Sequence, residues 1–233
     1  EDGLVWYWNF DNDQNGSSNA VNATIGGMNG TKGSGVTVVN GKFGNALNFD
    51  GSTNANSYVD FGSGSRTNFD GIFSVSLWVK RTGAYSGYGR LVTNKSGGST
   101  SGFQIYFSTT NDRLYVKGTT QTRYGRATSS WTAQNWVHVV TTFNAQAAST
   151  AQRFKMYADG SFVTQGDMPK IEQGSANLIF GKSPGGGSRM IGSLDDVRFY
   201  DRELSGAEAS TLYGSGNGDF VTVRTGTMAS IKK

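Results

Sequence analysis

Hydrophobic residues recur at every second position in many short segments of the chain. The segment 73–79 reads FSVSLWV, and the segment 103–107 reads FQIYF. A period of two is typical of β-strands with one buried face, because successive side chains point to opposite sides. The same pattern, bounded by Gly, Asn, Asp or Ser, predicts further strands at residues 4–10, 36–39, 46–49, 58–61, 90–94, 114–117, 136–143, 154–158, 177–180 and 194–200.

One short helix is predicted near the end of the chain. Ser205 and Glu208 have the spacing of a capping box, in which each side chain accepts a backbone N–H at the helix start. Gly214 is placed to end this helix. Many short strands with scarcely a helix predict an all-β sandwich or barrel rather than a βαβ fold.

The composition indicates a globular protein rich in turns. Glycine makes up 34 of 233 residues but shows no G-X-Y period, which excludes collagen, and 12% aromatic residues argue against disorder. The absence of cysteine excludes disulfides, zinc–thiolate sites and a thiol nucleophile. We expect one domain at residues 1–215, and we interpret residues 216–233 as a tail or a linker to a further module.

The charge and hydrophobicity of the chain argue against two classes of partner, nucleic acids and membranes. The net charge is +4, and no run of Lys or Arg exceeds two residues, so we expect no nucleic-acid binding. No apolar segment is long enough to span a bilayer, so we expect no membrane insertion. The chain begins Glu1-Asp2-Gly3 without a basic and apolar leader, so we expect any signal peptide to have been removed already.

Six segments in a fixed order resemble a known family. The first is an early hairpin formed by 44–51 (GNALNFDG) and 58–62 (YVDFG). The other five are 73–80 (FSVSLWVK), 136–140 (WVHVV), 156–160 (MYADG), 192–200 (GSLDDVRFY) and 204–208 (LSGAE). This pattern resembles bacterial laminin-G-like, concanavalin-A-like jelly-roll domains. The resemblance implies a two-sheet antiparallel jelly-roll β-sandwich, but no particular ligand, because such sandwiches carry many different sites.

Aspartates that could ligate a cation occur at three places, together with one loop glycine: Asp11, Asp13, Asp50, Gly51, Asp195 and Asp196. Terminal strands of a jelly roll commonly pair, which would bring residues 4–10 close to residues 194–200. Carboxylates and loop carbonyls suit Ca²⁺, and the resemblance also implies a structural calcium. We expect Asp11, Asp50 and Asp196 as ligands, with Asp13 and Asp195 in reserve. The alternative is that these aspartates only cap turns.

The chain offers few groups for catalysis. His138 is the only histidine and lies in an apolar strand, where a packed structural role is expected. Jelly-roll hydrolases carry two carboxylates on one strand, whereas no two glutamates of this chain share a strand. No G-x-S-x-G motif occurs. We therefore predict no catalytic residues and no enzyme activity.

Aromatic and basic residues occur together in segments that we expect to be loops. They are Tyr85, Tyr88, Arg90, Arg123, Tyr124, Arg126, Trp131 and Arg189. Aromatic rings stack on the C–H faces of sugars, and arginine pairs with carboxylate or sulfate oxygens. We expect these residues to bind a glycan, and an acidic glycan would match the positive net charge. The alternative is that they are ordinary loop residues that keep the surface soluble.

The tryptophans are interpreted by their phase within the strands. Trp6 and Trp8 share one face of the first strand, and we expect both in the core. Trp78 is out of phase with its apolar neighbours, so it lies on the other face of its strand. It could line a ligand surface, but we expect loops to cover it.

These features predict a non-catalytic carbohydrate-binding or adhesion module of a larger secreted or cell-surface bacterial protein. The expected partners are a polysaccharide and flanking modules of the same polypeptide. A structural or protein-contact spacer is the alternative. A polysaccharide lyase or glycoside hydrolase of jelly-roll fold comes third.

Overall fold

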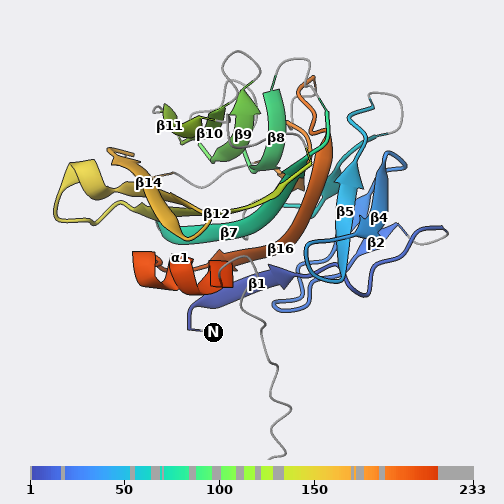
Figure 1. The fold of residues 1–233 in the computed structure, drawn as a ribbon, viewed down its shortest axis with the longest axis horizontal. Coiled ribbons are helices and arrows are strands. Elements are labelled where there is room, and N and C mark those ends of the chain that lie inside the picture. The colour runs from blue at the N-terminus through green and yellow to red at the C-terminus, as the bar shows by residue number, and fades with distance from the viewer. Residues whose placement is uncertain are drawn as a thin grey trace, which may run out of the picture.

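The strand pattern folds into two antiparallel sheets that face each other in the computed structural model (Figure 1). The structure describes residues 2–16, 19–52, 56–63, 69, 71–83, 88–95, 101–108, 113–118, 122–127, 134–168, 171, 176–183 and 187–214, with only the backbone of 122–127. The predicted all-β antiparallel sandwich is confirmed.

The first sheet has the order β14-β13-β12-β7-β16-β5-β4, and β1 also pairs with β16. Its strands are β1 (Leu4–Trp8), β4 (Val36–Asn40), β5 (Asn45–Phe49), β7 (Ile72–Arg81), β12 (Trp136–Asn144), β13 (Phe154–Ala158), β14 (Ser161–Gly166) and β16 (Gly192–Tyr200). A short 3₁₀ helix, η3 (Thr150–Gln152), precedes β13.

The second sheet has the order β11-β10-β9-β8-β15-β6-β3-β2. Its strands are β2 (Ala20–Val21), β3 (Gly30–Lys32), β6 (Val59–Asp60), β8 (Tyr88–Thr93), β9 (Gln104–Ser108), β10 (Arg113–Lys117), β11 (Thr122–Ala127) and β15 (Ile179–Phe180).

Strand β16 lies inside the first sheet and changes its partner half-way along. It pairs with β7 on one side, and on the other side with β5 at its start and with β1 at its end. A bulge between Asp195 and Arg198 separates the halves, and Asp196 has a φ of 53°. The Tyr7 hydroxyl donates to Asp196, whose other oxygen lies 3.0 Å from Arg198 Nη2. The terminal strands therefore pair antiparallel, as predicted.

The side chain of Trp8 connects the two sheets. It is fully buried, and its ring centroid lies 6.0 Å from that of Phe199 in the first sheet and 5.4 Å from that of Phe180 in the second. Its indole N–H donates to the Met28 carbonyl at 2.9 Å. Trp6 is buried in the same core, so the core prediction for both tryptophans is confirmed.

Helix α1 (Gly206–Tyr213) begins and ends as the sequence predicts. The Ser205 hydroxyl accepts the Glu208 N–H, and the Glu208 carboxylate accepts the Ser205 N–H, which completes the capping box. Gly214 ends the helix in the left-handed conformation with a φ of 55°.

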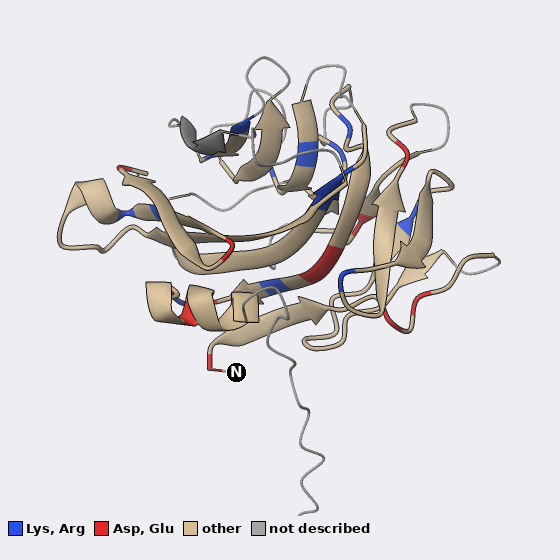
Figure 2. Ribbon diagram, viewed as in Figure 1, with Lys and Arg blue, Asp and Glu red and all other residues tan. Residues whose placement is uncertain are grey.

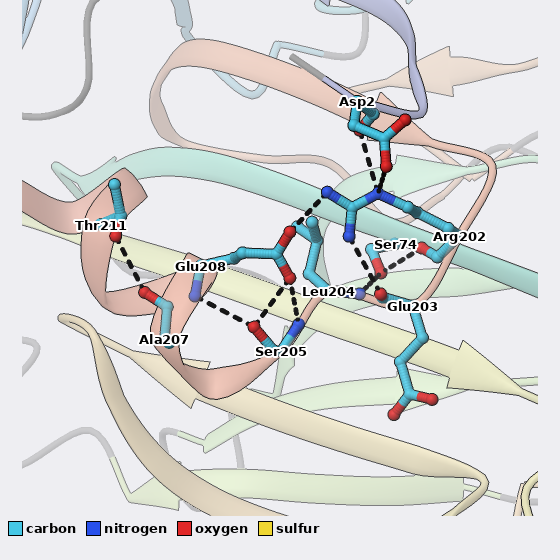
Figure 3. A network of polar contacts seen from close by, with 9 residues as sticks. All are labelled: Asp2, Ser74, Arg202, Glu203, Leu204, Ser205, Ala207, Glu208 and Thr211. Atoms are coloured by element: carbon cyan, nitrogen blue, oxygen red, sulfur yellow. Dashed lines mark hydrogen bonds and ion pairs between the residues drawn. The ribbon is translucent and has the colours of Figure 1, made fainter.

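A polar network fixes α1 against the outer face of the first sheet (Figure 3). Arg202 donates to the Glu208 carboxylate and to the Asp2 carbonyl. The Ser74 hydroxyl, from β7, donates to the Arg202 carbonyl at 2.8 Å and accepts the Leu204 N–H at 2.9 Å. The helix start is therefore bonded directly to a strand of the sheet beneath it.

Helix α1 and a neighbouring turn cover Trp78. Its ring stacks with Tyr213 at a centroid distance of 5.8 Å, meets Phe43 edge-on at 5.6 Å, and is only 1% exposed. The prediction that Trp78 is covered is confirmed, although a helix contributes to the cover. His138 lies beside it with Nε2 2.9 Å from the Ser76 hydroxyl, and burial lowers the pKa of His138 to about 3. His138 is therefore a buried neutral residue, as expected.

Among the described residues, none of the helices is long and apolar enough to cross a membrane.

The position of Trp8 predicts a large effect of its removal. Trp8→Ala should lower the free energy of unfolding by about 3–5 kcal/mol, because a large side chain is lost from between the sheets. Phe162 is 56% exposed, so the free energy of unfolding of Phe162→Ala should stay within about 0.5 kcal/mol of the wild-type value. Urea unfolding checks both values, and equal effects of the two substitutions would contradict the assignment of Trp8 to the core.

Candidate functional site

The two sheets differ in what their outer faces carry. The first sheet is covered by α1, whereas β8, β9 and β10 of the second sheet direct aromatic and basic side chains outward. In β9 and β10, Ile105 and Leu114 belong to the core, so strand alternation directs Tyr106 and Tyr115 to the outer face. In Figure 2, β8 carries a basic residue, and β16 carries both acidic and basic residues.

Four of these side chains form a continuous stack, which we call the tyrosine–arginine cluster: Tyr88, Arg90, Tyr106 and Tyr115. The Arg90 guanidinium lies 4.9 Å from the Tyr88 ring centroid and 4.2 Å from that of Tyr106. Tyr106 stacks on Tyr115 at 5.5 Å, with an angle of 14° between the rings. Tyr88 is 43% exposed, so the cluster is open to a ligand at this end.

Arg90 keeps hydrogen-bond donors unused inside the cluster. Its Nε and Nη1 atoms are buried and have no hydrogen-bond partner within the part of the chain that the structure describes. Burial lowers the pKa of Arg90, and the neighbouring Tyr106 opposes this shift. The guanidinium nevertheless remains charged in proteins. An anionic group that reached it would satisfy donors that are costly to leave unpaired.

Two more cations continue the positive surface toward β15. Gly181 donates its N–H to the Leu91 carbonyl at 3.0 Å, so the residue before Lys182 is bonded to the residue after Arg90. Lys182 forms a β-bridge with Arg189, whose Nε and Nη1 are also buried without a partner among the described residues. Burial and the charge of Arg189 lower the pKa of Lys182. We call the cluster together with Lys182 and Arg189 the basic–aromatic surface.

The structure brings some of the predicted ligand-binding residues together and places several of them in strands rather than in loops. Tyr88 belongs to strand β8, not to a loop. Arg90 lies in the same strand, in agreement with the strand predicted at 90–94, and Arg189 lies in a bridge beside Lys182. The segment with Arg123, Tyr124 and Arg126 also forms a strand, β11, so the expectation of a loop was wrong there too.

The remaining predicted ligand residues are only partly described. Register places Tyr124 opposite Tyr115, but the side chains of β11 are not described. Tyr85 and Trp131 lie outside the described residues.

Sequence analysis missed Tyr106, Tyr115 and Lys182. The signal was present for the two tyrosines, because both alternate with apolar residues inside predicted strands and therefore face outward. Lys182 is followed by a glycine-rich segment, where no strand alternation applies.

The aspartates predicted to ligate calcium accept hydrogen bonds from other groups of the chain, and two of them meet at one turn. Asp11 accepts the Asn45 N–H at 2.8 Å, and Asp195 accepts the N–H groups of Lys42 and Phe43 at 2.8 and 2.9 Å. Both carboxylates therefore bind the turn between β4 and β5.

The other predicted ligands have their own partners. Asp13 accepts the Asn22 N–H at 3.0 Å, and Asp50 accepts the Ser52 N–H at 2.8 Å, as in a turn cap. Gly51 donates its N–H to the Ser57 hydroxyl at 3.0 Å, and Asp196 binds Tyr7 and Arg198.

These residues do not fit one calcium site. Among the described residues, one oxygen each of Asp13 and Asp195 is buried without a hydrogen-bond partner, but the two residues belong to different groups of contacts. Across the described ranges, no three His, Cys, Asp or Glu residues come together in a way that could hold a metal ion. Calcium stays a prediction, and no function is derived from it.

Residues 50–210 match the family model of the concanavalin A-like lectin/glucanases superfamily. The chain belongs to this superfamily. The resemblance identified in the sequence is thereby confirmed. No curated protein sequence matches the chain.

Solved structures with the same fold include domain 4 of AbnA, a GH43 extracellular arabinanase from Geobacillus stearothermophilus, in complex with arabinotriose. It is 19% identical with a TM-score of 0.67, and the match covers 90% of this chain and 98% of that domain. Trypanosoma rangeli sialidase with the inhibitor DANA is 14% identical with a TM-score of 0.67, covering 91% of this chain and 33% of the sialidase.

The binding domain of Paraclostridial Mosquitocidal Protein 1 is 17% identical with a TM-score of 0.65, covering 91% of this chain and 52% of that one. This chain thus spans about a third of the sialidase and about half of the toxin domain. At these identities the matches show the fold alone.

The burial of Asp195 predicts a pH dependence of stability. Burial raises the pKa of this carboxyl from 3.8 to about 8, against the opposing effect of the Phe43 N–H. The folded state then holds a proton that the unfolded chain has lost. The free energy of unfolding should therefore fall as pH rises from about 4 to about 8, by up to ~1.4 kcal/mol per pH unit.

Asp195→Asn keeps an acceptor oxygen for the turn and cannot ionise, so it should remove this decline. Urea unfolding at pH 5 and pH 9 measures the difference, with Asp50→Asn at an exposed turn as the control. If the Asp195→Asn variant loses as much stability between these pH values as the wild type, the assignment is wrong.

Proposed function

We propose that this domain binds a polysaccharide through the basic–aromatic surface, and that carboxylate or sulfate groups of the glycan pair with Arg90, Lys182 and Arg189. The observation that carries the proposal is the position of the Arg90 guanidinium between Tyr106 and the exposed Tyr88 ring, with donors that have no hydrogen-bond partner among the described residues.

The chemistry of each side chain supports this assignment. A half-exposed tyrosine ring offers a flat apolar surface to the C–H face of a sugar. A guanidinium presents parallel donors to the two oxygens of a carboxylate or sulfate. Because Arg90 is already held between two rings, little side-chain freedom is lost when a ligand binds.

The comparisons support a sugar ligand at the level of the family. The arabinanase domain was solved with arabinotriose. The arabinanase is an extracellular enzyme, which supports our proposal that this domain belongs to a secreted or cell-surface protein of a bacterium.

We further propose that the domain has no catalytic activity of its own. Hydrolysis of a glycosidic bond needs two carboxyl groups on either side of it. The basic–aromatic surface consists of tyrosine, arginine and lysine, which can hold an anionic chain but supply no such pair. This arrangement favours binding over cleavage.

Binding to a panel of polymers tests the proposal. Affinity electrophoresis should show retardation by polygalacturonate, alginate or carrageenan, weakening as salt is added, because charge pairing is screened. Arg90→Gln should weaken binding about tenfold or more, the usual effect of losing a charged hydrogen bond. Arg90→Lys should restore only part of it, since an ammonium cannot form the fork.

Arg153→Gln is the matched control, because it removes the same charge beside β13 of the first sheet. It should bind like the wild type, and the melting temperatures of all variants should be compared. Absence of binding to every polymer would favour the spacer interpretation instead. Release of reducing ends or unsaturated products from these polymers would contradict the non-catalytic role.

A further inference from the structure

A separate polar pocket opens at the other end of the second sheet. It has a volume of about 600 Å³ and lies against β3 and β6, with Thr31, Lys32, Asn56, Tyr58, Asp60 and Asn177 in its lining. This volume falls in the range of sites that hold small ligands. We call it the Asp60 pocket.

Asp60 is held as a fixed acceptor in this pocket. Its Oδ1 accepts the Gly62 N–H at 2.8 Å, and the Asn177 amide nitrogen lies 2.9 and 3.0 Å from the two carboxylate oxygens. An ionised carboxylate can accept about four hydrogen bonds, so capacity remains for ligand hydroxyls. Thr31, Asn56 and Asn177 are exposed and carry further polar groups of both kinds.

The pocket and the basic–aromatic surface meet at Tyr58. The Lys182 Nζ lies 3.4 Å from the centroid of the Tyr58 ring, which lines the pocket. Asp60 is opposite Ile179, and Ile179 is opposite Thr93 of β8. Two strand spacings, about 10 Å, therefore separate Asp60 from the strand that carries Arg90. One oligosaccharide can reach both places.

The two places offer different hydrogen-bonding groups to a ligand. Arg90 offers guanidinium donors, whereas Asp60 offers a carboxylate that accepts hydroxyl protons and whose charge is partly balanced by the neighbouring Lys182. We propose that the Asp60 pocket is a subsite for an uncharged sugar residue, next to the anionic residue held by the basic–aromatic surface. This rests on the proposed function, and it narrows the ligand to a glycan in which charged and uncharged residues are neighbours.

Isothermal titration and amide NMR shifts with defined trisaccharides test the subsite. The probes are arabinotriose, cellotriose and galactotriose, which are uncharged, and trigalacturonate, which is charged throughout. At least one uncharged probe should shift the Gly62 and Asn177 amide resonances. Asp60→Asn preserves the shape of the side chain and its hydrogen bond to the Gly62 N–H. It should weaken binding of that probe about tenfold and leave trigalacturonate binding unchanged.

Arg90→Gln should have the opposite effect: it should weaken binding of trigalacturonate and leave binding of the uncharged probe unchanged. Asp167→Asn, beyond the end of β14 in the first sheet, is the matched control for loss of a carboxylate. The subsite is overturned if no uncharged probe shifts these amides, or if Asp60→Asn leaves their binding unchanged or stronger. Unchanged trigalacturonate binding in Arg90→Gln would instead overturn the proposed function.

Discussion

The bulge in β16 is the constraint on which the arrangement of the first sheet depends. At this point the strand stops pairing with β5 and starts pairing with β1, while β7 stays on its other side. The left-handed conformation of Asp196 is unfavourable for a residue with a side chain, and the bonds of its carboxylate to Tyr7 and Arg198 stabilise it. Only with β1 in this position can Trp8 reach both sheets.

The same organisation explains why the two outer faces differ. On the first sheet, β7 and β16 direct Trp78, Arg198 and other large or polar side chains outward, and α1 buries several of them. On the second sheet, outward residues of β8 and β10 remain half-exposed. A binding surface built on paired strands is held more rigidly than one built on loops, which favours selective recognition of a stiff ligand.

Much of the fold could be predicted from the sequence because strand alternation and helix capping are local signals. The 73–79 segment, the capping box at Ser205 and the burial of Trp8 all depend on near neighbours in the chain. The proposed binding surface could be predicted only in part, because it is assembled by register. Nothing local indicates that Lys182 lies over Tyr58, or that Asn177 meets Asp60.

The acidic residues give a second example of long-range contacts that the sequence does not reveal. Asp195 and Asp11 lie far apart in sequence, and both bind backbone N–H groups of the turn between β4 and β5. The expected pairing of the terminal strands and the family resemblance suggested a cation for these carboxylates, since the identity of the long-range donor is invisible in the sequence. Their engagement by the turn is a property of the assembled sandwich.

The pairing of β1 with β16 has a mechanical consequence. Leu4 is opposite Tyr200, so the first residues of one strand lie beside the last residues of the other. A force that drew these two ends apart would load the hydrogen bonds one after another, as in a zipper, rather than all at once in shear. Once Arg202 and α1 were detached from the sheet, this domain would yield progressively under tension from that corner.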